Sequence, residues 1–313
     1  METFLNLTIP VFVVIAIGWI AARKGIVPDA AVSGLNAYVF NFGVPCLVIG
    51  TFARQPFGEL VEPLFLASWL VAGLAVFGLS ALLTRLLFRE GPGEMALMGQ
   101  GAAIGNIGFI GLPLMLEAFG PKGAGPLAAA LVVDLVLIIP MSILILEARK
   151  GGAGSGASKA LAALKGAMIN PFLLSILAGI AVSLSGITLP GPVDRTIGFL
   201  GAAAAPTALF ALGMSLAGRQ VEGNMAQVGL MSAMKLVAHP AALFAAMTVF
   251  KVPPAIAGMG LVLAALPVAS NVFVIAERYG VAVRRCSSAI VVSTAIAVVT
   301  VTAAIEIARR MAG

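Results

Sequence analysis

The sequence predicts an all-α membrane protein in which ten transmembrane helices form two inverted repeats of five helices, with the broken helices 4 and 9 crossing each other. Three observations lead to this fold class. Hydrophobic residues make up 60% of the 313 residues and charged residues only 10%, whereas a soluble domain carries roughly 25% charged residues. The hydrophobic residues form continuous runs that are long enough to span a membrane. Short motifs recur at one spacing in the two halves, and two runs are interrupted by Gly, Pro and Asn.

Composition and missing motifs exclude several other classes. The alternation of polar and apolar residues that a transmembrane β-barrel requires is absent. The net charge of +6 does not indicate nucleic-acid binding, because the basic residues stand at the ends of apolar runs and act as topology signals. The sequence contains no phosphate-binding P-loop, no HExxH and no GxSxG, and its two cysteines form no metal-binding pattern. We therefore expect no enzyme activity, no cofactor and no metal site.

The apolar runs predict where the helices lie. A Gly/Ser-rich linker at residues 151–160 separates a first repeat at 1–150 from a second repeat at 161–313. At about 20 residues for each membrane crossing, the predicted helices cover roughly 4–22, 34–52, 62–84, 96–119, 124–148, 166–185, 194–217, 226–249, 255–277 and 286–308.

Four matches in register relate the two halves. Pro10 and Pro171 are 161 residues apart, as are Pro45 and Pro206. Two short motifs also recur, Gly25-Ile26 as Gly186-Ile187 at the same spacing and Glu117-Ala118-Phe119-Gly120 as Glu277-Arg278-Tyr279-Gly280 at 160 residues. Because each half has an odd number of helices, the second copy enters the membrane upside down, which is the inverted-repeat plan of secondary transporters.

The basic residues also predict an orientation. If the N-terminus is outside, the inner connections hold twelve Lys and Arg residues and the outer side holds six. This bias favours a multi-pass protein of the cell inner (plasma) membrane with both termini outside the cytoplasm. The first residues contain Glu2 and no basic residue, so we expect the first helix to be retained rather than cleaved as a signal peptide.

Two interrupted runs are the candidate binding site. The first holds three glycines, Asn106 and Pro113, and the second reads Leu266-Pro267-Val268-Ala269-Ser270-Asn271. The repeat offset puts Pro267 opposite Ile107, so we expect the breaks to cross near the midplane at Asn106-Ile107 rather than at Pro113. Opened backbone N–H groups there would suit an anion. The predicted substrate-binding residues are Asn106, Ile107, Gly108, Pro267, Ser270 and Asn271, with Asn41 on the opposite wall. The alternative is a pair of proline kinks with a glycine packing face.

Three ionisable residues lie inside apolar runs, where charges are costly and usually functional. Asp134 is in the middle of its run, and Lys235 and His239 share one face of another helix at i, i+4. A structural ion pair between Asp134 and Lys235 is one interpretation. A proton-linked or anion-linked switch is the other, and His239 has the residue type for it. A neutral His239 bonded to a carbonyl is an equal alternative.

The motif Gly105-Asn106-Ile107-Gly108-Phe109-Ile110-Gly111-Leu112-Pro113-Leu114 resembles the fourth-helix motif of the auxin efflux carrier family. The run from Leu266 through Gly280 is similar to the ninth-helix motif of that family, and Pro206 through Leu216 is similar to its seventh. The resemblance covers nearly the whole chain and is strongest to bacterial permeases described as malonate transporters. Plant members carry a large central hydrophilic loop where this chain has only its short linker.

This resemblance implies the fold of bile-acid-type sodium symporters and NhaA-like antiporters. It implies a scaffold domain of helices 1, 2, 6 and 7, a transport domain of helices 3–5 and 8–10, elevator movement and a homodimer. It also implies that Asn106 and Asn271 bind a carboxylate at the crossing. Plant carriers hold an Asp/Lys pair away from the substrate, but the third helix here has no Asp. Asp134 therefore does not inherit that role, whereas Lys235 can.

The functional expectation is a secondary carrier of a small organic carboxylate anion such as malonate. The alternative is an anion channel, or an electrogenic uniporter for another carboxylate such as an auxin-like acid. The expected partners are this small anion, the lipid bilayer and a second copy of the chain, but no nucleic acid. Coupling to protons, sodium or membrane potential is left open, with sodium disfavoured because Asp134 is the only deep carboxylate.

Overall fold

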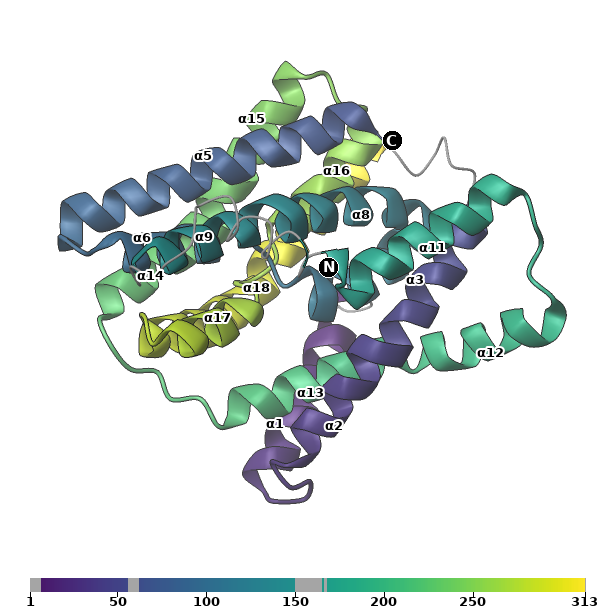
Figure 1. The fold of residues 1–313 in the computed structure, drawn as a ribbon, viewed down its shortest axis with the longest axis horizontal. Coiled ribbons are helices and arrows are strands. Elements are labelled where there is room, and N and C mark those ends of the chain that lie inside the picture. The colour runs from purple at the N-terminus through teal and green to yellow at the C-terminus, as the bar shows by residue number, and fades with distance from the viewer. Residues whose placement is uncertain (1–6, 56–61, 150–164, 166–167, 313) are drawn as a thin grey trace. The chain divides into compact units, whose positions relative to one another are not determined.

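The computed structural model describes residues 7–55, 62–149, 165 and 168–312 (Figure 1). The predicted linker at 151–160 lies outside these residues. Within the described ranges every named element is helical, and one isolated antiparallel bridge joins Gly105 to Val268. The chain divides into two compact units. The first contains Met1–Glu62, Gly108–Ala128 and Ile169–Arg219, and the second contains Pro63–Ile107, Ala129–Met168 and Gln220–Gly313.

The described helices are those of a multi-pass membrane protein. By length and composition, six helical stretches can cross a membrane: Ala31–Ala53, Pro63–Phe88, Ile107–Arg149, Gly191–Ala217, Met225–Val249 and Val283–Met311. Three apolar helices are shorter, namely Ile9–Arg23, Pro171–Ser185 and Pro254–Ala264. The expectation of an all-helical membrane protein is confirmed at this level.

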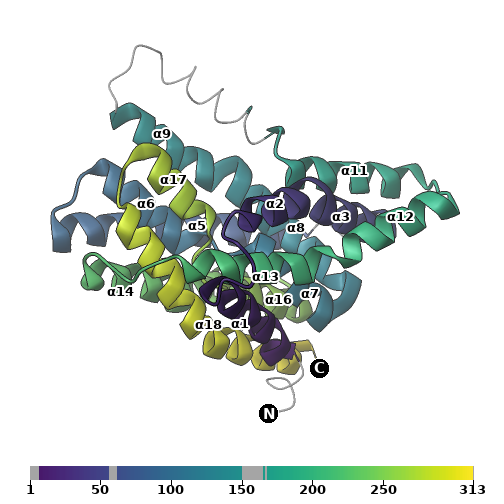
Figure 2. The same cartoon turned by 90° about the horizontal axis from the view of Figure 1, so that it is seen from below.

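The first unit is built from two groups of helices. Its elements are α1 (Ile9–Arg23), α2 (Ala31–Tyr38), the π-helix η2 (Val39–Gly43), α3 (Val44–Ala53), the π-helix η3 (Ile107–Gly111, of which all but Ile107 belongs here), α7 (Leu112–Phe119), the 3₁₀ turn η4 (Gly120–Gly123), α11 (Pro171–Ser185), α12 (Gly191–Ala202) and α13 (Ala204–Ala217). Figures 1 and 2 show α1 alongside α13, and α3 packs against both α11 and α12. The helix α8 (Ala124–Val133) runs from this unit into the second.

Two glycines allow α1 and α13 to pack backbone to backbone. A Cβ added at Gly18 would overlap the carbonyl oxygen of Phe210, and one at Gly213 would overlap the carbonyl oxygen of Ile15. Helices in lipid gain no hydrophobic driving force from each other, so close contact between backbones supplies much of their attraction. The abundance of glycine in the sequence has this packing role at the α1–α13 interface.

The second unit contains the longer helices. Its elements are α5 (Pro63–Phe88), α6 (Pro92–Ala103), the π-helix η5 (Asp134–Ile138), α9 (Ile139–Arg149), α14 (Met225–Ala233), the π-helix η6 (Met234–Ala238), α15 (His239–Val249), α16 (Pro254–Ala264), α17 (Asn271–Tyr279) and α18 (Val283–Ala312). The helix α5 packs against α6 and α15, and α16 packs against α18. Phe65 and Trp69 of α5 are completely buried in this unit.

Each of the four named π-helices precedes a proline. The pairs are Val39–Gly43 with Pro45, Ile107–Gly111 with Pro113, Asp134–Ile138 with Pro140, and Met234–Ala238 with Pro240. Proline donates no backbone hydrogen bond, and its ring displaces the carbonyl of the preceding turn. The widened turn accommodates that displacement without breaking the helix. Such π-turns occur frequently at functional sites, and Asn41, Gly108, Asp134 and Lys235 all lie within them.

Gly213→Ala tests the α1–α13 contact. The added methyl group has no space against Ile15, so we expect the apparent free energy of unfolding in detergent to fall by about 1–3 kcal/mol. Gly198→Ala on α12 is the matched control, because nothing lies within 4 Å of its added Cβ. The control should be neutral or gain up to about 1 kcal/mol of helix stability. Equal unfolding temperatures for the two variants would contradict the packing account.

Candidate functional site

The two interrupted runs meet through their backbones inside the second unit. Helix α6 ends at Ala103, and Ile104 continues in an extended conformation. Helix α16 ends at Ala264 and α17 begins at Asn271. The backbone N–H of Asn106 donates to the carbonyl of Pro267 at 2.9 Å, and that of Ala269 donates to Ile104 at 3.2 Å. These reciprocal bonds make the antiparallel bridge between Gly105 and Val268.

Glycine is required at the centre of this bridge. A Cβ on Gly105 would lie 3.2 Å from Cε of Lys235 and 3.3 Å from both the carbonyl oxygen of Leu263 and Cβ of Leu266. Pro113 has a different position, because it stands in the first turn of α7 directly after η3. The helix therefore stops at Ile104–Asn106 and not at Pro113.

Amide and hydroxyl side chains surround the bridge. Asn106 is 3% exposed, and its Nδ2 lies 3.5 Å from the Ser270 hydroxyl. The Oδ1 atom of the half-buried Asn271 is itself buried and has no hydrogen-bond partner among the described residues. Ile107 and Pro267 are buried beside them. Of the predicted binding residues, these five are brought together in the second unit.

The backbone amides at the bridge are already in use. Besides those of Asn106 and Ala269, the N–H of Val268 donates to the Ser293 hydroxyl at 3.1 Å. The sequence analysis expected opened N–H groups to meet an anion. These three instead hold the bridge together, because a buried N–H group without a partner is costly. The side chains of Asn106, Ser270 and Asn271 remain as the polar groups with bonding capacity for a ligand.

Two predicted binding residues belong to the first unit. Asn41 lies exposed in η2, and its Nδ2 donates to the Ala37 carbonyl at 2.8 Å. Gly108 is half-buried, and a Cβ there would lie 3.2 Å from Cζ of Phe172. The ring of Phe40 contacts Phe109 edge to face at 5.1 Å between centroids. This part of the first unit is therefore aromatic rather than charged.

The three ionisable residues predicted inside the helices are all buried in the second unit. Nζ of Lys235 lies 2.7 Å from the carbonyl oxygen of Ala264, the last residue of α16, and 2.8 Å from Nδ1 of His239. Oδ1 of Asp134 accepts a hydrogen bond of 3.0 Å from the Trp69 indole. The described side chains form no direct ion pair between Asp134 and Lys235.

Trp69 connects this cluster and was not predicted from the sequence. Its indole N–H reaches Asp134, and its ring packs edge to face against His239 with centroids 5.2 Å apart. The available signal was a tryptophan in the middle of a helix, since a buried indole N–H needs an acceptor. Asp134 was the only aspartate deep enough to supply one.

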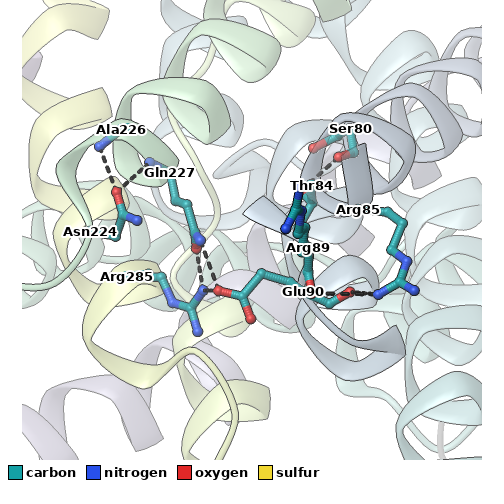
Figure 3. A network of polar contacts seen from close by, with 9 residues as sticks. All are labelled: Ser80, Thr84, Arg85, Arg89, Glu90, Asn224, Ala226, Gln227 and Arg285. Carbon is teal, nitrogen blue, oxygen red and sulfur yellow. Dashed lines mark hydrogen bonds and ion pairs between the residues drawn. The ribbon is translucent and has the colours of Figure 1, made fainter. Parts of the chain in front are cut away.

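A second polar network in the same unit lies at the ends of its helices (Figure 3). The carboxylate of Glu90 accepts hydrogen bonds from Gln227 at 2.8 Å and from Arg285 at 2.5 Å. Arg285 also donates to the side-chain oxygen of Gln227. Asn224 caps α14 by accepting from the N–H groups of Ala226 and Gln227. The hydrogen bond from Gln227, aided by Arg285 and opposed by partial burial, lowers the pKa of Glu90 below its ordinary value of 4.5.

An all-helical membrane protein whose broken helices meet at a buried polar bridge belongs to the class of solute transporters. Comparison with known protein families agrees, since residues 3–305 match the family described as "Membrane transport protein". The chain belongs to this family, the auxin efflux carriers. It is therefore a transporter and not an enzyme, and its cargo is a small molecule.

Individual relatives match over most of their length. A protein of Rhizobium meliloti (strain 1021), provisionally named as a malonate transporter, is 32% identical over 310 residues, covering 99% of this chain and 97% of the relative. An uncharacterized transporter of Escherichia coli (strain K12) is 24% identical, covering 93% of each chain. An uncharacterized transporter of Methanothermobacter thermautotrophicus is 27% identical, covering 74% of each.

Glu90→Gln tests the helix-end network through its pH dependence. A carboxyl whose pKa is lowered on folding stabilises the fold above its unfolded pKa, and that contribution is lost as the pH falls through the folded pKa. We expect the variant to lose less than about 1 kcal/mol at neutral pH and to match the wild type in acid below the lowered pKa of Glu90. Thermal unfolding in detergent across this pH range measures the difference. Glu94→Gln on the same helix is the control, and a pH-independent difference for Glu90→Gln would contradict the account.

Proposed function

We propose that the protein is a secondary carrier of a small organic carboxylate, with malonate as the first candidate. The observation that carries the proposal is the bridge of two broken helices, surrounded by amide and hydroxyl side chains with bonding capacity to spare. Discontinuous helices that meet at the membrane midplane form the substrate sites of many secondary transporters. The provisional name of the Rhizobium meliloti relative, at 32% identity, supports malonate as the first compound to test.

The position of the bridge supports the proposed inverted repeat. Its central hydrogen bond joins Asn106 to Pro267, two residues 161 apart in the sequence, and the motifs of the two halves recur at that same spacing. A residue on a twofold axis between repeats meets its own equivalent. The proposal therefore takes α6 with α7 as helix 4 and α16 with α17 as helix 9, within ten transmembrane helices.

The carboxylate is proposed to bind the side chains of Asn106, Asn271 and Ser270. An amide N–H or a hydroxyl that donates to a carboxylate forms a charge-assisted hydrogen bond, which is stronger than a neutral one. Helix α17 begins at Asn271, and the positive end of its dipole adds a favourable potential for an anion. Ile107, Gly108 and Pro267 are proposed to shape the site, with Asn41 contributing from the scaffold.

The two units support a division of labour within an elevator mechanism. We assign α1–α3 and α11–α13, which lie in the first unit, to the scaffold domain. The transport domain comprises the second unit together with Gly108–Ala128, because that segment continues the chain directly from the bridge. A homodimer joined through the scaffold helices, in the inner membrane with both termini outside the cytoplasm, completes the proposal.

Asn106→Ala and Asn271→Ala test the binding residues. Each variant removes a hydrogen bond to a charged group, worth about 1.5–3 kcal/mol, so we expect uptake of labelled malonate into proteoliposomes to fall roughly 10- to 100-fold at low substrate concentration. Asn224→Ser is the matched control, because serine preserves the cap of α14. Wild-type uptake in both Asn→Ala variants would refute the site.

Counterflow distinguishes a carrier from the alternative anion channel. A carrier loaded with unlabelled malonate should accumulate labelled malonate transiently, because one moving site exchanges the two. A channel, or an electrogenic uniporter for another carboxylate such as an auxin-like acid, gives a different result. The channel conducts without counterflow, and the uniporter shows counterflow only with its own substrate. Parallel assays with malonate and an auxin-like acid, under a clamped membrane potential, separate the three.

A further inference from the structure

We propose that Asp134 binds a proton whose charge effect favours binding of the carboxylate at the bridge, so that the carrier moves both together. The inference rests on the proposed function and deepens it. It comes from the cluster of Trp69, Asp134, Lys235 and His239 in the second unit, which the proposed carboxylate site does not use.

The hydrogen bonds fix the state of His239. The ammonium group of Lys235 has three donors and no acceptor, so at 2.8 Å it must donate to Nδ1 of His239. Nδ1 therefore offers its lone pair, and the imidazole is neutral with its hydrogen on Nε2. Since Lys235 occupies Nδ1, a proton added to the cluster goes elsewhere.

Asp134 is the group left to receive it. Its Oδ1 atom accepts from Trp69, whereas Oδ2 is buried and has no partner among the described residues. The Nε2 atom of His239 is also buried without a partner there. A buried carboxylate with an unpaired oxygen is costly, and a proton on Oδ2 removes the charge while Trp69 continues to donate to Oδ1. One O–H bond forms on Oδ2 when the proton enters, and it breaks when the proton leaves.

No other titratable side chain lies within the middle of the helices packed around this cluster. The remaining ones on the described parts of α5, α6, α9, α14, α15, α16 and α18 stand within two turns of a helix end. They are Arg85, Glu94, Glu147, Arg149, Arg284, Arg285, Cys286, Glu306, Arg309 and Arg310. The internal charge of this region is therefore set by Asp134 and Lys235.

Lys235 carries the effect to the bridge. With Asp134 ionised, the charges of Asp134 and Lys235 sum to zero, and with Asp134 protonated the cluster carries one positive charge. The ammonium group is bonded to Ala264 at the end of α16, and its Cε adjoins Gly105 at the centre of the bridge. An uncompensated cation there attracts an anion. By reciprocity, the bound carboxylate favours the proton by the same factor.

The test is the pH dependence of malonate binding by purified protein in detergent. Over about pH 7 to 9, where carboxylic acids of ordinary pKa are ionised, the wild-type affinity should fall by up to about tenfold for each rise of one pH unit. Asp134→Asn keeps a neutral side chain and should bind malonate with an affinity that does not change with pH. Glu306→Gln, on the same unit, should retain the wild-type slope. A flat wild-type profile, or a wild-type slope in Asp134→Asn, would overturn the inference.

Trp69→Phe excludes a purely structural role for Asp134. Phenylalanine preserves a ring against His239 but removes the donor to Oδ1, so the ionised carboxylate loses a partner. The pH dependence of binding should therefore move to higher pH while its slope stays the same. An unchanged profile would contradict the assignment of Asp134.

An infrared titration separates failure of this inference from failure of the proposed function. If neither wild type nor variant binds any carboxylate tested, the proposed function fails. In the ligand-free protein, the pH-dependent difference spectrum should still contain a carboxylic-acid band that is missing in Asp134→Asn. Identical spectra for the two proteins would overturn the proton site, whatever the substrate is.

Discussion

The reciprocal hydrogen bonds between Asn106 and Pro267 and between Ala269 and Ile104 are the interaction on which the second unit depends. Lipid offers no partner to a free N–H or carbonyl, so a helix can stop inside the membrane only if another segment satisfies its backbone. Here each broken run satisfies the other. That exchange fixes where Asn106, Ser270 and Asn271 lie, and it brings the end of α16 to Lys235.

Much of the fold was predictable because its signals are local. Apolar length indicated the helices, and Gly105 and Pro267 marked the two breaks without reference to any distant residue. The contacts of Trp69 with Asp134 and of Ser293 with Val268 were not predictable. They depend on how one helix is rotated against another, and an apolar helix in lipid has no polar face that would reveal this rotation. The same uncertainty explains why the backbone amides at the breaks were expected to be open.

The buried charges show how one contact redirects others. The sequence left open whether Lys235 pairs with Asp134, and in the structure the ammonium group lies against His239 and the carbonyl of Ala264 instead. A helix ends with unsatisfied carbonyls and a partial negative charge. Thr300 binds the next carbonyl, that of Ala265, at 3.1 Å. The end of α16 is thus stabilised by a charge and a hydroxyl, which leaves the carboxylate of Asp134 to Trp69.

The prolines that follow the π-helices have a consequence for how side chains are aimed. A widened turn holds one residue more than an α-turn, and one residue corresponds to about 100° of rotation around the helix axis. Pro140 and Pro240 therefore set the compass direction of Asp134 and Lys235 relative to the rest of their helices. Loss of either proline would let the helix rewind and swing its ionisable group toward another neighbour. A chain of this kind can retarget a buried charge by gaining or losing a proline one turn away, with the charged residue itself unchanged.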